Sequence, residues 1–289
     1  QLIRRHLDLA ERFYQDFQRI ALGQAAPAFN AELGAAIDVA CSDPQDRQIL
    51  KTFLTFNEGL LLTNFFKQET PGAFAFRLNP AVVLKDRPVS MYPEVPYAIY
   101  LVVGRDFIGF HTRFRDVARG GIRIVLSRDK AAYERNFATL FDEGYNLAFT
   151  QQNKNKDIPE GGAKGVILPD SCWSNSLKAD SGNMLLGNSS QSPAASRLCF
   201  INYLNALLDC MQPDQNNLYT GNMKGQELLF FGPDENTAGF MDLGAEIARE
   251  RGYPYWKAIT TGKSVSLGGV PHDTYAMTTT SVHTYVTEL

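Results

Sequence analysis

Residues 97–126 read YAIYLVVGRDFIGFHTRFRDVARGGIRIVL, and this stretch decides the fold. It contains three runs rich in β-branched and aromatic residues, YAIYLVV, FIGFHTRF and GIRIVL, which predict three short strands. A helical pattern follows from Arg128 to about Asn153, and the apolar run VILP (166–169) then predicts a buried strand. Strands interleaved with helices indicate an α/β domain, here expected to hold a mixed sheet flanked by helices.

Helical segments flank this β-rich centre. Residues 1–22 carry apolar residues at helical spacing, a stretch containing Gly, Ala and Pro follows to about Pro44, and residues 45–67 again look helical. We therefore expect residues 1–90 to form a helical layer, although the run AFAFRLNP alternates as a strand does. Further helices are expected over 195–211, 237–251 and 274–285, and the Ser/Asn/Gly-rich residues 171–195 predict a long exposed loop.

Composition excludes several classes of protein. The net charge of −3 does not suggest a nucleic-acid surface, and no apolar run approaches the length of a membrane span. The N-terminus does not resemble a signal peptide, and it opens inside a helical pattern, so we expect the chain to be part of a longer protein. The four cysteines have no CxxC spacing and predict reduced thiols in an intracellular protein, cytoplasmic or in the mitochondrial matrix: Cys41, Cys172, Cys199 and Cys210.

The stretch PEGGAKG (159–165) is the most informative for chemistry. Three glycines around Lys164 allow the backbone to pass close to a ligand and hold the amine in a cramped, partly desolvated place. Burial or neighbouring cations would lower the pKa of such a lysine. Taken alone, the stretch would more simply be a tight turn with a solvated lysine.

Two further stretches combine a charged residue with glycine. In ARGGIR, Arg119 precedes two glycines, and in GPDENTAG, Asp234 follows Gly232 and Pro233 just before a predicted helix. Each has a structural interpretation: Asp234 would cap a helix or turn, and Arg119 would brace its turn through a carboxylate such as Asp116.

The order of these motifs along the chain favours a functional interpretation over the structural ones. ARGGIR, KNKDIPEGGAKG, GPDENTAG and TTGKSVSLGG follow one another as they do in glutamate dehydrogenases. From about Tyr92 onward the chain resembles the large NAD-dependent branch of that family, within the wider group of Glu/Leu/Phe/Val dehydrogenases. The resemblance implies a substrate-binding domain over residues 91–270, followed at 271–289 by the start of a dinucleotide-binding domain. It also implies NAD as cofactor, L-glutamate, 2-oxoglutarate and ammonia as small-molecule partners, and a homo-oligomer.

The resemblance assigns roles residue by residue. Lys164 matches the catalytic lysine, and Asp234 matches the aspartate that handles protons at the amino group. Arg119 stands where small enzymes of the family bind the side-chain carboxylate with a lysine, and Gly120 matches a glycine whose backbone faces the substrate. Thr261 falls on the threonine of the family's TGK, near the substrate side chain. Lys154, with Lys156 as a rival, matches the lysine that binds the α-carboxylate, and Thr278 matches a threonine at the start of the first helix of the cofactor domain.

This chemistry also suits the residue types themselves. Two cations would hold the two carboxylates of a dicarboxylic amino acid, so that its Cα–H points at the oxidant. A lysine with a lowered pKa can accept a proton from the water that attacks the iminium carbon. We expect Lys154 and Arg119 to supply that lowering by crowding Lys164 with positive charge.

Other functions are weighed against this one. Leucine, valine and phenylalanine dehydrogenases share GGAKG but usually carry an apolar residue where Arg119 stands, and a degenerate regulatory module has no reason to retain Lys164, Asp234 and Arg119 together. Asp273 occupies a position where small glutamate dehydrogenases have an arginine, so that interaction is not carried over. TTGKS lacks the first glycine of a phosphate-binding P-loop, because Lys257 stands there, and the four histidines have no metal-binding spacing. No GxGxxG occurs, so we expect the dinucleotide fold beyond Leu289.

Overall fold

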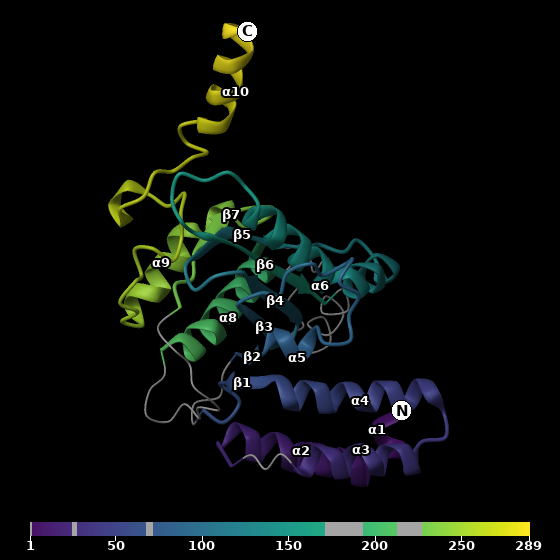
Figure 1. Ribbon diagram of the computed structural model, residues 1–289. Helices are drawn as coiled ribbons and strands as arrows, with labels where there is room; N and C mark the ends of the chain where they lie inside the picture. Colours follow the sequence, from purple (N-terminus) through teal and green to yellow (C-terminus); the bar gives the residue numbers. More distant parts are fainter. Residues whose placement is uncertain (1, 25–27, 68–71, 171–192, 213–226) are drawn as a thin grey trace.

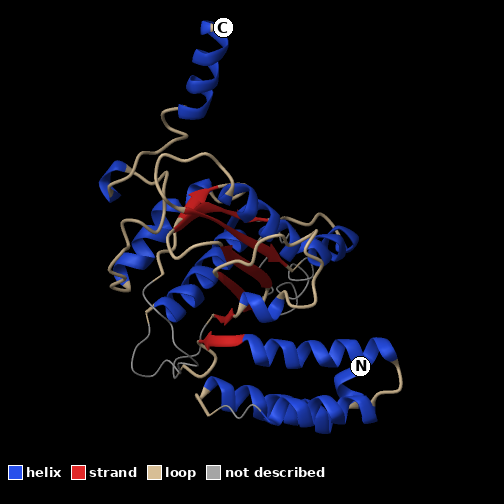
Figure 2. Cartoon of the chain, viewed as in Figure 1, coloured by secondary structure: helices blue, strands red, loops and turns tan. Residues whose placement is uncertain are grey.

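The computed structural model describes residues 2–24, 28–67, 72–170, 193–212 and 227–289. A seven-stranded sheet lies at the centre, with helices against it and a separate layer of N-terminal helices below (Figures 1 and 2). The strands are β1 (Leu60–Thr63), β2 (Ala73–Leu78), β3 (Ala98–Gly104), β4 (Phe107–Arg113), β5 (Ala118–Ile124), β6 (Gly161–Pro169) and β7 (Phe231–Pro233). The predicted α/β class with a mixed sheet flanked by helices is confirmed.

The direction of the strands changes across the sheet. The strand order is β1-β2-β3-β4-β6-β5-β7, and neighbours from β1 through β4 to β6 run antiparallel. At the other end, β5 runs parallel to both β6 and β7. In this parallel part Ile122 of β5 pairs with Gly165 on one side and with Pro233 on the other, so the three glycine-containing motifs meet in adjacent strands.

Two long helices cover opposite faces of the sheet. Helix α6 (Lys130–Gln152) lies on the face of Val166, since a side chain at Gly144 of α6 would come 3.2 Å from it. Helix α8 (Pro193–Met211) lies on the face of Gly165, which is close to Tyr203 of α8. Buried residues of α8 and of the sheet form the largest core, including Phe200, Tyr203, Leu204, Leu207, Ile122, Ile124 and Ile167.

The N-terminal layer consists of α1 (Leu2–Arg5), α2 (Leu7–Ala21), α3 (Ala28–Ala40) and α4 (Pro44–Gly59). A small core of its own holds these helices together, with buried members Leu9, Phe13, Leu33, Ile37, Cys41 and Leu50. A second cluster joins the layer to the sheet, because Phe17 and Ile20 of α2 pack with Leu60 and Leu78.

The stretch before Pro44 contains helix α3, which belongs to the expected helical layer. Two expectations for the secondary structure are wrong. The helix expected over 45–67 ends at Gly59, because the apolar residues that follow pair with β2 as strand β1, so the sheet takes its first two strands from residues 1–90. Strand β6 begins at Gly161 rather than at Val166, since Ala163 and Lys164 pair with β4. Lys164 therefore lies in the middle of a strand and not near its end.

The remaining elements follow β7 or lie between strands. They are α5 (Pro80–Val83), the short 3₁₀ helices η1 (Ala238–Phe240) and η2 (Val265–Leu267), α9 (Met241–Glu250) and α10 (Met277–Glu288). Helix α10 projects away from the body of the molecule (Figure 1), and none of its residues is buried.

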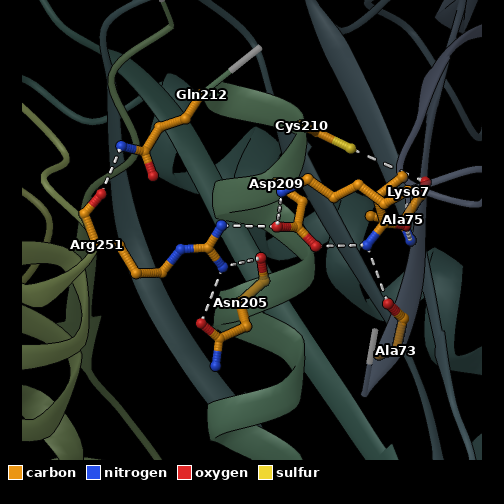
Figure 3. Close-up of polar contacts among 9 residues, drawn as sticks. Lys67, Ala73, Ala75, Asn205, Asp209, Cys210, Gln212 and Arg251 are labelled. Atoms are coloured by element: carbon orange, nitrogen blue, oxygen red, sulfur yellow. Dashed lines mark hydrogen bonds and ion pairs between the residues drawn. The ribbon is translucent and has the colours of Figure 1, made fainter. Parts of the chain in front are cut away.

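Asp209 of α8 joins three parts of the chain, as Figure 3 shows. Its carboxylate accepts hydrogen bonds from Lys67 Nζ at 2.7 Å and from Asn64 Nδ2 at 2.8 Å, both on the segment after β1. On the other side it accepts one from Arg251 Nη2 at 2.6 Å, directly after α9. Asn64 also binds the backbone of Ala73 and Ala75 in β2, so this cluster fixes α8 against the sheet edge and α9.

The three cysteines in the described ranges are buried free thiols, Cys41, Cys199 and Cys210, and burial raises the pKa of Cys199 to about 12. Cys172 and nearly all of the predicted loop at 171–195 lie outside the described residues. None of the helices that the structure describes is long and apolar enough to cross a membrane.

Candidate active site

Lys164 and Asp234 form an ion pair between β6 and the turn after β7. The Lys164 side chain is 10% exposed and the Asp234 side chain 33%, so the amine is buried while the carboxylate reaches the surface. Asp234 has a second, structural contact, because its Oδ1 accepts a hydrogen bond from the backbone N–H of Glu235 at 2.7 Å. Asp234 thus has the turn contact that the sequence suggested and also pairs with Lys164, while its role in proton transfer stays a prediction.

The turn that carries Asp234 is fastened to the end of β5. Thr237 Oγ1 donates to the carbonyl of Ile122 at 2.6 Å, and Asn236 Nδ2 donates to that of Ile124 at 2.9 Å. Asn236 has a φ of +62°, in the left-handed region that asparagine tolerates better than most residues. These bonds fix the Asp234 carboxylate over β5, beside Lys164.

Glycines of the two motifs allow this close arrangement. A side chain at Gly120 would overlap the carbonyl of Ala163, and one at Gly162 would overlap the backbone of α6 at Ala148 and Gln152. At Gly121 an added Cβ would come 2.7 Å from Asp234 Oδ2. The glycines are therefore required where β5, β6, α6 and the Asp234 turn pack together.

The environment of Lys164 lowers its pKa to about 8. Burial is the largest cause, and the nearby positive charge of Arg123 is the next, with a smaller contribution from Lys154. We expected Lys154 and Arg119 to lower the pKa of Lys164. The expectation is confirmed for Lys154, but the other cation that lowers this pKa is Arg123 and not Arg119. The Asp234 carboxylate, in contact with the amine, favours its protonated form in return.

Arg123 is a residue of this site that the sequence interpretation missed. It forms ion pairs with Glu143 of α6, at 2.5 Å, and with Glu235 beside Asp234. Side chains of a strand alternate between faces, so Arg123 shares the face of Arg119 and Gly121. The period of two within ARGGIR was the signal that could have identified it.

Arg119 lies near the start of β5 with its side chain 43% exposed. Its Nε lies 2.6 Å from Oε1 of Glu160, the residue directly before β6. The brace that we considered through Asp116 is thus not the ion pair observed. Arg119 stays a candidate for binding a substrate carboxylate, because its side chain remains partly open to solvent.

The two rival lysines differ in their surroundings. Lys156 Nζ donates to the backbone carbonyls of Glu160 at 3.2 Å and of Gly161 at 3.0 Å, and its side chain is 6% exposed. Lys154 is exposed and near enough to Lys164 to lower its pKa. Of the two, Lys154 is the one available to a ligand beside Lys164.

Two threonines complete the predicted set. The backbone N–H of Thr261 donates to the carbonyl of Phe231 at 3.0 Å, so Thr261 lies beside β7. Phe231 precedes Asp234 by three positions in the sequence. Lys263, in the same TGK stretch, is buried and donates to the carbonyl of Thr260, which suits a structural lysine. Thr278 is exposed on the projecting α10, apart from the other residues, and its cofactor role stays a prediction.

The arrangement can hold a small polyanion and move a proton. Arg119, on the strand next to Lys164, and Lys154, near enough to lower the pKa of that lysine, offer exposed positive charge, and Asp234 offers a carboxylate that contacts the buried amine. An amine with a pKa of about 8 is part neutral near neutral pH, as a general base must be. Such a site suits acid–base chemistry on an anionic substrate.

Comparisons with known proteins agree with this geometry. The chain is 43% identical over 287 residues to glutamate dehydrogenase 2 of Dictyostelium discoideum. This match covers 96% of the present chain and 25% of that protein. It is 47% identical over 250 residues to the NAD-specific glutamate dehydrogenase of Saccharomyces cerevisiae, covering 86% of this chain and 21% of that protein. It is 44% identical over 261 residues to the NAD-specific glutamate dehydrogenase of Neurospora crassa, and this match covers 89% of the present chain and 23% of that protein.

The chain thus spans about a quarter of the length of the curated relatives it matches. The model of one protein family, described as the catalytic domain of bacterial NAD-glutamate dehydrogenase, matches residues 33–287. That range includes the whole sheet and each residue of the candidate site. The chain therefore belongs to the family of NAD-glutamate dehydrogenase catalytic domains.

Proposed function

We propose that the full-length protein oxidises L-glutamate to 2-oxoglutarate and ammonia with NAD, and catalyses the reverse reaction. In this proposal the present chain supplies the substrate-binding half of the catalytic domain. The observation that carries it is the Lys164–Asp234 pair, in which a buried amine with a pKa of about 8 contacts a carboxylate that is one-third exposed. Neighbouring Gly120, Gly121 and Gly162 leave no space for side chains around this pair.

Binding of the substrate falls to the two open cations. Arg119 would hold the side-chain carboxylate and Lys154 the α-carboxylate, with Gly120 and Thr261 alongside, so that Cα lies over Lys164. Arg119 also supports the wider assignment to the Glu/Leu/Phe/Val dehydrogenases with glutamate as the substrate, because a permanent cation suits a dicarboxylate better than a branched aliphatic side chain.

The proton steps fall to Lys164 and Asp234. Bound NAD would supply the oxidant for removal of hydride from Cα, and Thr278 would be a contact for it; the described residues contain no GxGxxG sequence. Water then attacks the iminium carbon while neutral Lys164 accepts a proton from it. Asp234, in contact with the Lys164 amine, carries a proton to the departing ammonia.

Two further points complete the proposal. We propose an intracellular location, in the cytoplasm or the mitochondrial matrix, which the buried free thiols of the described residues support. We also propose assembly as a homo-oligomer, which the family resemblance implies.

The test is Lys164→Ala in the full-length protein. Loss of the base should lower kcat for glutamate oxidation by roughly 10²–10⁴-fold, the usual cost of a lost acid–base group. Lys130→Ala, which removes an exposed lysine at the start of α6, is the matched control and should leave kcat unchanged. Near-normal turnover in a correctly folded Lys164→Ala protein would show that Lys164 is not the base.

A further inference from the structure

Glu160 is a buried carboxylate at the edge of the candidate site. Its side chain is 8% exposed, and its Oε1 lies 2.6 Å from Arg119 Nε and 3.9 Å from Lys156 Nζ. Neither cation forms an aligned hydrogen bond with this oxygen, so the contact is electrostatic. A carboxylate is rarely buried to this degree unless it is paired, and here its nearest charged atom belongs to Arg119.

The backbone holds Glu160 in a fixed position. Lys156 donates to the carbonyls of Glu160 and Gly161, and the N–H of Gly161 donates to the carbonyl of Val117 at 2.9 Å. Glu160 is therefore anchored to β5 just before Arg119, which pairs with Gly162 in the parallel ladder. The short distance to Arg119 thus follows from the fold of the two strands.

Nε is the guanidinium atom of Arg119 that lies 2.6 Å from Glu160 Oε1. Among the residues that the structure describes, no hydrogen bond is found from either terminal nitrogen of Arg119, so both can donate to a ligand. An unrestrained arginine side chain has high conformational entropy, which is lost when the side chain binds a ligand. A contact at Nε restricts the side chain beforehand and so reduces the entropy lost on binding. The terminal nitrogens then offer two parallel donors, the geometry that matches a carboxylate.

We infer that Glu160 is a positioning residue that selects a dicarboxylate by holding Arg119 at Nε and directing its terminal nitrogens to the substrate's side-chain carboxylate. This inference rests on the proposed function. Glu160 does not touch the substrate and acts through Arg119 alone. Its effect is therefore confined to substrates that carry a side-chain carboxylate.

The test compares two variants of the full-length protein, Glu160→Ala and Glu160→Gln, on glutamate and on norvaline, whose side chain lacks a carboxylate. Glu160→Ala should raise KM for glutamate by roughly tenfold or more with little change in kcat, and should leave kcat/KM for norvaline within about threefold. Glu160→Gln should lose nearly as much as Glu160→Ala, because the contact is electrostatic and a neutral amide carries no charge to hold Arg119. Glu58→Gln, which removes another ion-paired glutamate at an exposed position on α4, should change neither substrate.

A double variant separates positioning from simple bracing of the fold. In an Arg119→Leu background, Glu160→Ala should have no further effect on kcat/KM for glutamate, because the residue through which Glu160 acts is gone. Equal losses on both substrates, an additive effect in that background, or a lower KM for glutamate would each overturn the inference. If the wild-type protein turns over no glutamate with NAD, the proposed function itself fails, which is a different result.

Discussion

Arg119 and Lys164 lie on the same face of adjacent strands, but their surroundings give them different chemistry. Lys164 is 10% exposed and its pKa is lowered to about 8 by burial and by Arg123, so it can exchange a proton near neutral pH. Arg119 is 43% exposed, and a guanidinium stays charged at any pH at which the protein is folded. The first suits proton transfer and the second suits permanent recognition of a carboxylate.

Replacing Arg119 should therefore change which substrate is used. Arg119→Leu in the full-length protein leaves a substrate carboxylate unpaired, which should lower kcat/KM for glutamate by roughly a hundredfold or more. Residual activity should shift towards leucine, valine or norvaline. Melting temperature and the ratio of specificity constants for glutamate and norvaline are measured together, and an unchanged ratio would discard the role of Arg119 in selection.

Helix α8 illustrates how a single charged residue fixes an element. Asp209 is buried, which raises its pKa, but hydrogen bonds from Lys67, Asn64 and Arg251 outweigh this and hold the pKa below the ordinary value (Figure 3). Asp209→Asn should lower the free energy of unfolding by about 3 kcal/mol, the usual cost of removing one partner of a buried ion pair. Urea unfolding measures it, with Asp38→Asn, at an exposed ion pair, as a control expected within about 0.5 kcal/mol of wild type.

The pH dependence gives this prediction a second test. A carboxylate whose folded pKa is lowered stabilises the protein above its unfolded pKa, and that stabilisation is lost as pH falls through the folded value. The difference between wild type and Asp209→Asn should thus be constant at neutral pH and shrink only below about pH 4. A difference that disappears between pH 6 and 8 would assign the effect to another group.

At the level of elements, the sequence predicted strands with a clear pattern and missed those without one. The runs that became β2, β3, β4 and β5 alternate or are rich in β-branched residues, and all four were predicted. The start of β6 was missed because GGAKG is unlike a strand, glycine being depleted there. Its strand conformation depends on tertiary neighbours, since β4 pairs with Lys164 and α6 leaves no space for a side chain at Gly162. Helix α4 was extended too far because LLLT suits a helix or a strand equally.

The candidate site shows the same limit. Lys164, Asp234 and Arg119 were identified from motifs, and the structure brings Lys164 and Asp234 into contact although seventy positions separate them. Arg123 and Glu160 were missed because their importance lies in partners, Glu143 and Glu235 for one and Arg119 for the other, that come from different elements. Spacing along the chain contains no information on those pairs.

Across the whole molecule, the antiparallel strands form a scaffold and the parallel strands form the site. Strands β1, β2 and β3 pack with the N-terminal helical layer, whereas β5, β6 and the segment of β7 bring together motifs from residues 118–124, 161–165 and 231–234. Lys164 lies where β4 and β5 flank β6, covered by α6 on its own face. The lowered pKa of its amine is thus a property of the whole assembly and not of the motif alone.

The pH dependence of kcat/KM for glutamate in the full-length protein tests the central claim most directly. A base must be neutral to accept a proton, so activity should rise with pH through an ionisation near 8, the value to which burial and Arg123 lower the pKa of Lys164. In Arg123→Gln this ionisation should move to higher pH, because removing a neighbouring cation favours the protonated amine. An ionisation near 8 that moves upward in the variant is the result that our account predicts, and a profile that Arg123→Gln leaves unmoved would contradict it.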